Sequence, residues 1–292
     1  MASKVGHQET FKRSFTQEDF NRFADLSGDN NPIHVDPEFS ARTHFGKTVA
    51  HGMLLYSTIC LVLSTQYPGA GVLQIKQEMM FRNPTYTDTE ITVKLDVIDV
   101  KLDEQRAEIR TVISLPDGKL ACDGNTMIHL PGWKGGFPGI DESMAAAGNS
   151  QAQTLKRLKI GQTAAAKRIF SVKDLAEYAD LSGDTNPLFN DADYARRFGF
   201  KDRIIPGPLL SGMFSDLFGT KLPGRGTNWL KQNLHFPSAA YLGDEIIARV
   251  EIIRLRPEKD LVNLRGTCTN SSGELVCQAQ SLVLVKDLEE YG

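Results

Sequence analysis

The chain has 292 residues, of which 41% are hydrophobic and 24% are charged, and its formal net charge is −3. This length suits two domains of ordinary size, the composition is that of a water-soluble globular protein, and the slightly negative charge gives no general attraction to nucleic acid. No stretch approaches the roughly 18 apolar residues of a membrane span. The N-terminus lacks the apolar core of a secretory signal and the four cysteines are scattered, so we expect a cytoplasmic protein with reduced thiols.

Two helices are predicted in the first half of the chain. Residues 17–24 carry apolar side chains about one helical turn apart, after Thr16 as the expected cap, and Ser27-Gly28 ends this helix. A second helix is predicted from about Gly52 to Thr65, where the residues are apolar almost all round, as in a fully buried helix.

Four short β-rich runs follow these helices. They cover residues 72–82, 90–101, 105–115 and 119–130, with turn signals at Asn83-Pro84 and Pro116-Asp117-Gly118. Helices followed by an antiparallel meander predict an α+β domain whose sheet wraps around a buried helix.

The chain also repeats itself at an offset of 155 residues. Residues 15–32 return as residues 170–187, and the same offset pairs Cys122 with Cys277. A repeat this long indicates a duplicated domain, since solenoid units run to about 20–50 residues. We predict a first copy over residues 10–131, a Gly/Pro/Ala-rich linker over 132–158, and a second copy over 159–288.

Reactive side chains are densest between Ser27 and His34, in the run Ser-Gly-Asp-Asn-Asn-Pro-Ile-His. Pro32 is expected to prevent the preceding helix from restarting, which predicts a bent loop for Asp29 and His34. A carboxylate and an imidazole that share one water can perform acid–base chemistry near neutral pH, and Asn31 could orient either partner.

The same run is also ordinary turn chemistry, in which Asp and Asn side chains hydrogen-bond nearby backbone. The second copy separates the two interpretations, because Asp184, Asn186 and Pro187 repeat the turn while Phe189 replaces His34. The turn therefore does not need the histidine, and we predict chemistry in the first copy alone.

A second cluster, His51-Gly52, leads into the buried helix. The N–H of Gly52 at the helix N-terminus could bind a carbonyl oxygen that becomes negative during reaction. Gly207, its counterpart, shows that a tight turn alone could require glycine there, while Pro208 removes a backbone N–H from the second copy. His51 is a candidate for binding substrate that could equally pack at the helix start.

At these residues the sequence resembles the MaoC-like (R)-specific enoyl-CoA hydratases, whose signature runs Ser-Gly-Asp-x-Asn-Pro-aliphatic-His, as residues 27–34 do. The resemblance extends through His51-Gly52-Met53 and residues 81–90 and, weakly, through the second copy. It implies two tandem hot-dog folds, each a curved antiparallel sheet wrapped around a long central helix.

The resemblance also implies an activity. Asp29 and His34 would activate a water that adds to a trans-2-enoyl-CoA, and Gly52 would stabilise the thioester oxyanion, giving an (R)-3-hydroxyacyl-CoA. No metal or cofactor would take part, and the sequence shows no Gly-rich loop for a nucleotide.

Several alternatives stay open at this point. The thioester could be carried by an acyl carrier protein, so that the enzyme would be a 3-hydroxyacyl-[acyl-carrier-protein] dehydratase. The chain could also be a non-catalytic acyl-thioester-binding protein or, as a minor alternative, a thioesterase. It could act as a monomer whose halves mimic a dimer, or as a homodimer.

Overall fold

The computed structural model describes residues 4–134, 137–145 and 152–289. Before residue 132 the elements are β1 (Gln8–Arg13), α1 (Gln17–Ser27), α2 (Pro32–Val35), α3 (Pro37–Ala41), α4 (Gly52–Thr65), β2 (Leu73–Phe81), β3 (Ile91–Lys101), β4 (Arg106–Ser114) and β5 (Leu120–His129). Those that follow are η1 (Glu142–Ala145), β6 (Thr154–Leu155), β7 (Leu158–Lys159), β8 (Thr163–Ile169), α5 (Val172–Ser182), α6 (Pro187–Asn190), α7 (Ala192–Arg197), α8 (Gly207–Thr220), β9 (Asn228–His235), β10 (Glu245–Arg256), η2 (Pro257–Lys259), β11 (Leu261–Thr269) and β12 (Leu275–Leu284).

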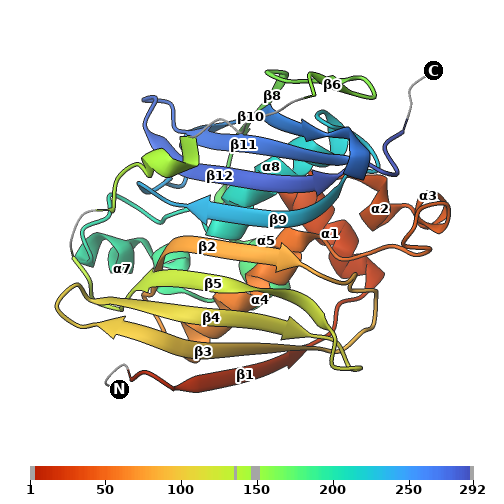
Figure 1. The fold of residues 1–292 in the computed structure, drawn as a ribbon. Helices are drawn as coiled ribbons and strands as arrows, with labels where there is room; N and C mark the ends of the chain where they lie inside the picture. The colour runs from red at the N-terminus through yellow and green to blue at the C-terminus, as the bar shows by residue number, and fades with distance from the viewer. Residues whose placement is uncertain (1–3, 135–136, 146–151, 290–292) are drawn as a thin grey trace.

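Ten strands form one antiparallel sheet that runs through both copies in the order β1-β3-β4-β5-β2-β9-β12-β11-β10-β8. The copies meet where β2 pairs with β9, from Lys76 opposite His235 to Met80 opposite Lys231. Figure 1 shows the helices gathered behind this sheet, with α4 behind the strands of the first copy and α8 behind those of the second. The predicted α+β class, with a sheet wrapped around a central helix in each copy, is confirmed.

The core explains why α4 is apolar all round. Every residue from Met53 to Ser64 is buried, because the sheet covers one side of the helix and α8 and α5 pack on the others. The side chains that face the helix alternate along the strands, as the burial pattern of Ile91 to Val97 shows. The predicted helix and all four predicted strands of the first copy are therefore confirmed to within one residue.

The first helix also has its predicted ends. The Thr16 side chain accepts a hydrogen bond from the Asp19 N–H, and the Asp19 carboxylate accepts one from the Thr16 N–H, which makes a capping box. Gly28 closes the helix with φ +84°, a conformation that glycine adopts without strain. The chain therefore leaves α1 in a fixed direction, toward Asp29.

The edge strands β1 and β8 were not predicted from the sequence. Their residues alternate between exposed and half-buried, and the sequence of β1, Gln-Glu-Thr-Phe-Lys-Arg, contains few residues that favour strands. A strand at a sheet edge has only one neighbouring strand, so polar residues are tolerated there.

The predicted linker over residues 132–158 lies partly outside the described residues, which omit 135–136 and 146–151. The part that is described packs on the sheet: Asp141 forms an ion pair with Lys76 at 2.7 Å, and the Gly139 carbonyl lies 2.7 Å from His235 Nε2. None of the helices in the described ranges is long and apolar enough to span a membrane.

Candidate active site

The segment from Gly28 to Pro32, here called the Asp29 turn, has a different form from the predicted loop. Pro32 starts a new helix, α2, so His34 lies within a helical turn. Proline suits the first position of a helix, since its missing N–H would have no partner there. Asn31 caps α2, and its side chain also donates to the carbonyl of Thr227 in the second copy at 3.0 Å. Asn31 therefore fixes the turn against the other half of the chain.

Asp29 is 1% exposed, and its carboxylate is held from both copies. Oδ1 accepts a hydrogen bond from the backbone N–H of Asn31 at 3.1 Å. Oδ2 accepts one from the hydroxyl of Ser215, which projects from α8. Hydrogen bonds of this kind stabilise the ionised form of a buried carboxylate.

His34 faces the same carboxylate. Its Nδ1 lies 2.7 Å from the carbonyl oxygen of Val49, which can only accept, so Nδ1 carries the proton and Nε2 presents a lone pair. Burial lowers the pKa of His34, an effect opposed by the Asp29 charge and the bond with Val49. The neutral imidazole is therefore favoured, which is the form that a general base requires.

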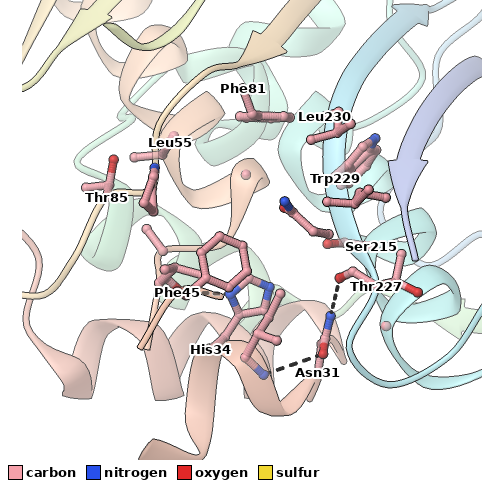
Figure 2. A pocket seen from close by; sticks show the side chains of 18 of the residues that line it. Asn31, His34, Phe45, Leu55, Phe81, Thr85, Ser215, Thr227, Trp229 and Leu230 are labelled. Atoms are coloured by element: carbon pink, nitrogen blue, oxygen red, sulfur yellow. Dashed lines mark hydrogen bonds between the residues drawn. The ribbon is translucent and has the colours of Figure 1, made fainter. Parts of the chain in front are cut away.

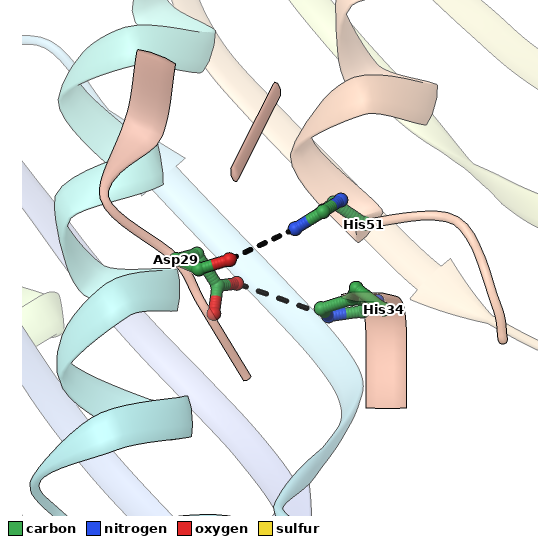
Figure 3. A group of neighbouring side chains, drawn as sticks. All are labelled: Asp29, His34 and His51. Atoms are coloured by element: carbon green, nitrogen blue, oxygen red, sulfur yellow. Dashed lines mark hydrogen bonds and ion pairs between the residues drawn. The ribbon is translucent and has the colours of Figure 1, made fainter. Parts of the chain in front are cut away.

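The two groups are spaced to share one water. Figure 3 shows the two side chains facing each other. His34 Nε2 and Asp29 Oδ2 are 3.8 Å apart, which is too long for a hydrogen bond. A water at ordinary hydrogen-bond distance from both atoms fits this separation. The predicted pair is thus brought together with a geometry suited to activating water.

Gly52 starts α4 beside this pair and lines the same cavity. Within the described residues no group accepts a hydrogen bond from its N–H, as expected at a helix N-terminus. A Cβ at this position would lie 2.6 Å from Phe81 Cζ. Glycine therefore lets Phe81 approach the helix end and leaves the N–H available to an oxygen in the cavity.

His51 lies behind His34 and does not line the cavity. The two imidazoles stack with centroids 3.8 Å apart, and His51 Nε2 lies 3.0 Å from the backbone carbonyl of Asp29. Asp29, His34 and His51 also meet the spacing of a metal-binding group. Each imidazole uses one nitrogen in a hydrogen bond with a backbone carbonyl and keeps its other nitrogen free of hydrogen, and of the two rings only His34 lines the cavity.

The cavity in front of the pair has a volume of about 370 Å³ and is built by both copies. Figure 2 shows Phe45, Leu55 and Thr85 of the first copy facing Ser215, Trp229 and Leu230 of the second. No sequence motif marks the residues from the second copy, and the one signal for them is Ser215, a serine on a largely apolar buried helix. His44 also lines the cavity and forms an ion pair with Asp287.

The corresponding site of the second copy is filled by side chains. Its cavity measures only about 40 Å³ and is bordered by Phe189 at the His34 position and by Phe137 from the segment between the copies. The Tyr56 hydroxyl occupies the space in front of Gly207, 2.7 Å from where a Cβ would be. Asp184 is still buried, with hydrogen bonds from Ser64 and Tyr178. The second copy therefore keeps the turn and has no room for a ligand of the same size.

Comparison with known proteins agrees with the duplication. The profile described as "MaoC like domain" matches residues 2–115 and 152–272. An (R)-specific enoyl-CoA hydratase of Rhodospirillum rubrum is 39% identical over 128 residues, which cover 44% of this chain and 88% of that protein. A mitochondrial 3-hydroxyacyl-[acyl-carrier-protein] dehydratase of Arabidopsis thaliana is 39% identical over 121 residues, covering 41% of this chain and 72% of that protein.

Solved structures resemble the whole chain. A MaoC-like dehydratase superposes with a TM-score of 0.77 at 18% identity, covering 97% of this chain and 98% of that one. A conserved hypothetical protein of Mycobacterium tuberculosis, described as having a double hotdog fold, gives 0.73 at 16% identity, with 97% and 96% covered. At these identities the comparison shows the fold, which is a double hot-dog.

Proposed function

The chain belongs to the MaoC-like domain family, and we propose that it is a hydro-lyase that reversibly hydrates a trans-2-enoyl-CoA to an (R)-3-hydroxyacyl-CoA. The names of its relatives support this reaction class. The observation that carries the proposal for the site is the 3.8 Å gap between His34 Nε2 and Asp29 Oδ2, at the edge of a cavity that also contains Gly52.

The geometry supports a single proton shuttle. A water held between the pair donates one hydrogen bond to Asp29 Oδ2 and the other to His34 Nε2. As its oxygen bonds to C3, Nε2 takes the proton and the C2–C3 π electrons move toward the thioester carbonyl. The resulting oxyanion accepts a hydrogen bond from the Gly52 N–H. The imidazolium, which Asp29 stabilises, then returns the proton to C2. Hydroxyl and proton therefore add to the same face.

The test uses crotonyl-CoA with the wild type, Asp29→Asn and His34→Ala, with Asp184→Asn as the matched control. We expect both first-copy variants to lose about two or more orders of magnitude in kcat while remaining folded, since one removes the negative charge that stabilises the imidazolium and the other removes the base. Asp184→Asn should keep its activity. Full activity in Asp29→Asn and His34→Ala would refute the assignment, and no hydration of any enoyl thioester by the wild type would favour the non-catalytic alternative.

The carrier of the acyl group is a separate part of the proposal. We favour CoA, while the Arabidopsis relative is named for an acyl-carrier-protein thioester. Matched crotonyl-CoA and crotonyl-carrier-protein substrates decide between them, because an enzyme for the carrier protein should be poor on the free CoA ester. Product analysis with the same substrates detects thioester hydrolysis.

We also propose that the chain acts as a monomer whose copies, over residues 10–131 and 159–288, take the places of two subunits. The continuous sheet across β2 and β9 supports this, because it supplies within one chain the contact that a dimer would make. Light scattering during gel filtration tests the stoichiometry. The cytoplasmic location remains a prediction, which cell fractionation tests.

A further inference from the structure

His51 is fully buried and touches both members of the proposed acid–base pair without reaching the cavity. Its ring stacks on His34 with an interplanar angle of 26°, and its Nε2 lies 3.0 Å from the carbonyl oxygen of Asp29. Figure 3 shows the His51 and His34 rings next to each other, both facing Asp29. Phe23, with its ring centroid 5.1 Å away, packs beside the same ring.

The contacts define one protonation state of His51. A carbonyl can only accept, so Nε2 carries the hydrogen. Nδ1 is buried and has no hydrogen-bond partner within the described part of the chain, so a proton placed there would be unpaired. Burial and the neighbouring His34 also hold the pKa of His51 well below its ordinary value. The ring is therefore a neutral, fixed donor rather than an acid or a base.

The second copy shows that the fold itself does not need this histidine. Pro206 occupies the equivalent position and leads into α8 with φ −58° and ψ 142°, nearly the same as the −59° and 137° of His51 before α4. His51 also makes no side-chain cap to α4. Both imidazoles are missing from the second copy, where Phe189 and Pro206 stand instead. A histidine at position 51 is therefore found together with His34, in the first copy alone, and is not required to start the helix.

We propose that His51 is a positioning residue, which fixes the separation of Asp29 and His34 by hydrogen bonding to the backbone of one and stacking on the ring of the other. This inference rests on the proposed function. Without the hydrogen bond, the Asp29 turn loses one of its links to the start of α4. Without the ring, water can enter behind His34 and reduce its burial.

The ring also controls the electrostatic surroundings of His34. The titratable groups that face this region are Asp29 from the turn, His51 from the start of α4, and His44 on the cavity wall. Asp216 and Arg168 lie farther off, beside Gly28. Since burial is the main cause that lowers the pKa of His34, admitting water should raise it.

Two variants separate the functions of the ring and the donor. His51→Gln keeps an N–H near the position of Nε2 and removes the ring, whereas His51→Phe keeps a ring and removes the donor. The matched control is His235→Gln, because His235 is also buried with Nε2 2.7 Å from a carbonyl, that of Gly139, and it lines neither cavity.

With crotonyl-CoA, we expect both His51 variants to lose roughly 10- to 100-fold in kcat with little change in KM, since small displacements of reacting groups have effects of this size. His51→Gln should also move the acid limb of kcat/KM to higher pH, whereas His51→Phe should leave that limb in place. His235→Gln should match the wild type in both. Wild-type kcat in both His51 variants, or a loss confined to KM, would overturn the inference.

Nitrogen-15 NMR of the imidazoles gives a readout that is independent of turnover. In the wild type, His51 should stay in the Nε2–H form without titrating, and the pKa of His34 should be higher in His51→Gln. Titration of His51 near pH 6, or an unchanged His34 in a folded His51→Gln, would refute the inference. Failure of the wild type to hydrate enoyl-CoA would instead refute the proposed function, and the NMR test would still decide the role of His51.

Discussion

Removal of the Ser215 hydroxyl tests whether the second copy takes part in the chemistry. The hydroxyl donates to Asp29 Oδ2, and Ser215 is only 5% exposed. Its matched control is Ser64, whose hydroxyl donates to Asp184 in the filled site at 2.6 Å. Both serines thus lie on a central helix of one copy and hold a buried aspartate of the other.

A hydrogen bond to a charged group contributes about 1.5–3 kcal/mol, so Ser215→Ala should lower the free energy of unfolding by an amount of this order. If the same interaction holds Asp29 in its reactive position, kcat should fall roughly 10- to 100-fold, since 1.4 kcal/mol corresponds to about one factor of ten. Ser64→Ala should also destabilise the protein, by about 1–3 kcal/mol, but should leave kcat unchanged.

The assay combines urea unfolding with turnover of crotonyl-CoA under conditions where each variant is folded. Because both variants lose a buried hydroxyl, the difference between their kcat values reports the effect that is specific to Ser215. Equal loss of kcat in both variants would show that the effect is only structural. An unchanged kcat in Ser215→Ala would show that the second copy supplies no group that matters to Asp29.

Three further predictions concern the same site. Because burial lowers the pKa of His34, the neutral base should persist as pH falls. The value of kcat/KM for hydration should therefore decline only below a pH of about 6.5, which is the ordinary pKa of histidine. A midpoint of this pH profile above that value would contradict the prediction. Gly52→Ala should lower kcat and destabilise the fold by about 1–3 kcal/mol, since the new methyl overlaps Phe81. Adding Phe81→Leu should recover stability, which melting curves would show. Phe189→His should create no second active site in an Asp29→Asn background, because Tyr56 still fills the space at Gly207. Hydration faster than that of Asp29→Asn alone would contradict this.

Local sequence patterns predicted the parts of the fold that depend on local physics. The helix over 52–65 and the strands of the first copy have strong apolar periodicities, which determine which side of each element is buried. The comparison of the two copies predicted that Asp29 and His34 act together, because the second copy repeats the turn but has Phe189 in place of His34. The structure places these two side chains at the separation that such a pair needs.

Contacts between distant segments could not be predicted in the same way. Ser215 and Asp29 are separated by 186 positions, and their contact exists only because α8 of one copy packs against the turn of the other. The position of His51 behind His34 has a similar origin, since it depends on where α4 begins relative to α2. The wrong expectation at Pro32 was different, because proline is compatible with both a loop and a first helical turn.

Because both copies lie on one chain and share one sheet, the protein should differ from a dimer on dilution and in how its sequence can evolve. Two halves on one chain remain together at any dilution, so a cavity built from both should keep its specific activity at enzyme concentrations where separate subunits would dissociate. Tethering also allows each half to vary alone. Position 215 can hold serine while its counterpart holds Cys60, whereas identical subunits would have to carry the same residue in both places. One cavity can thus be optimised for a reaction while the other becomes solid core.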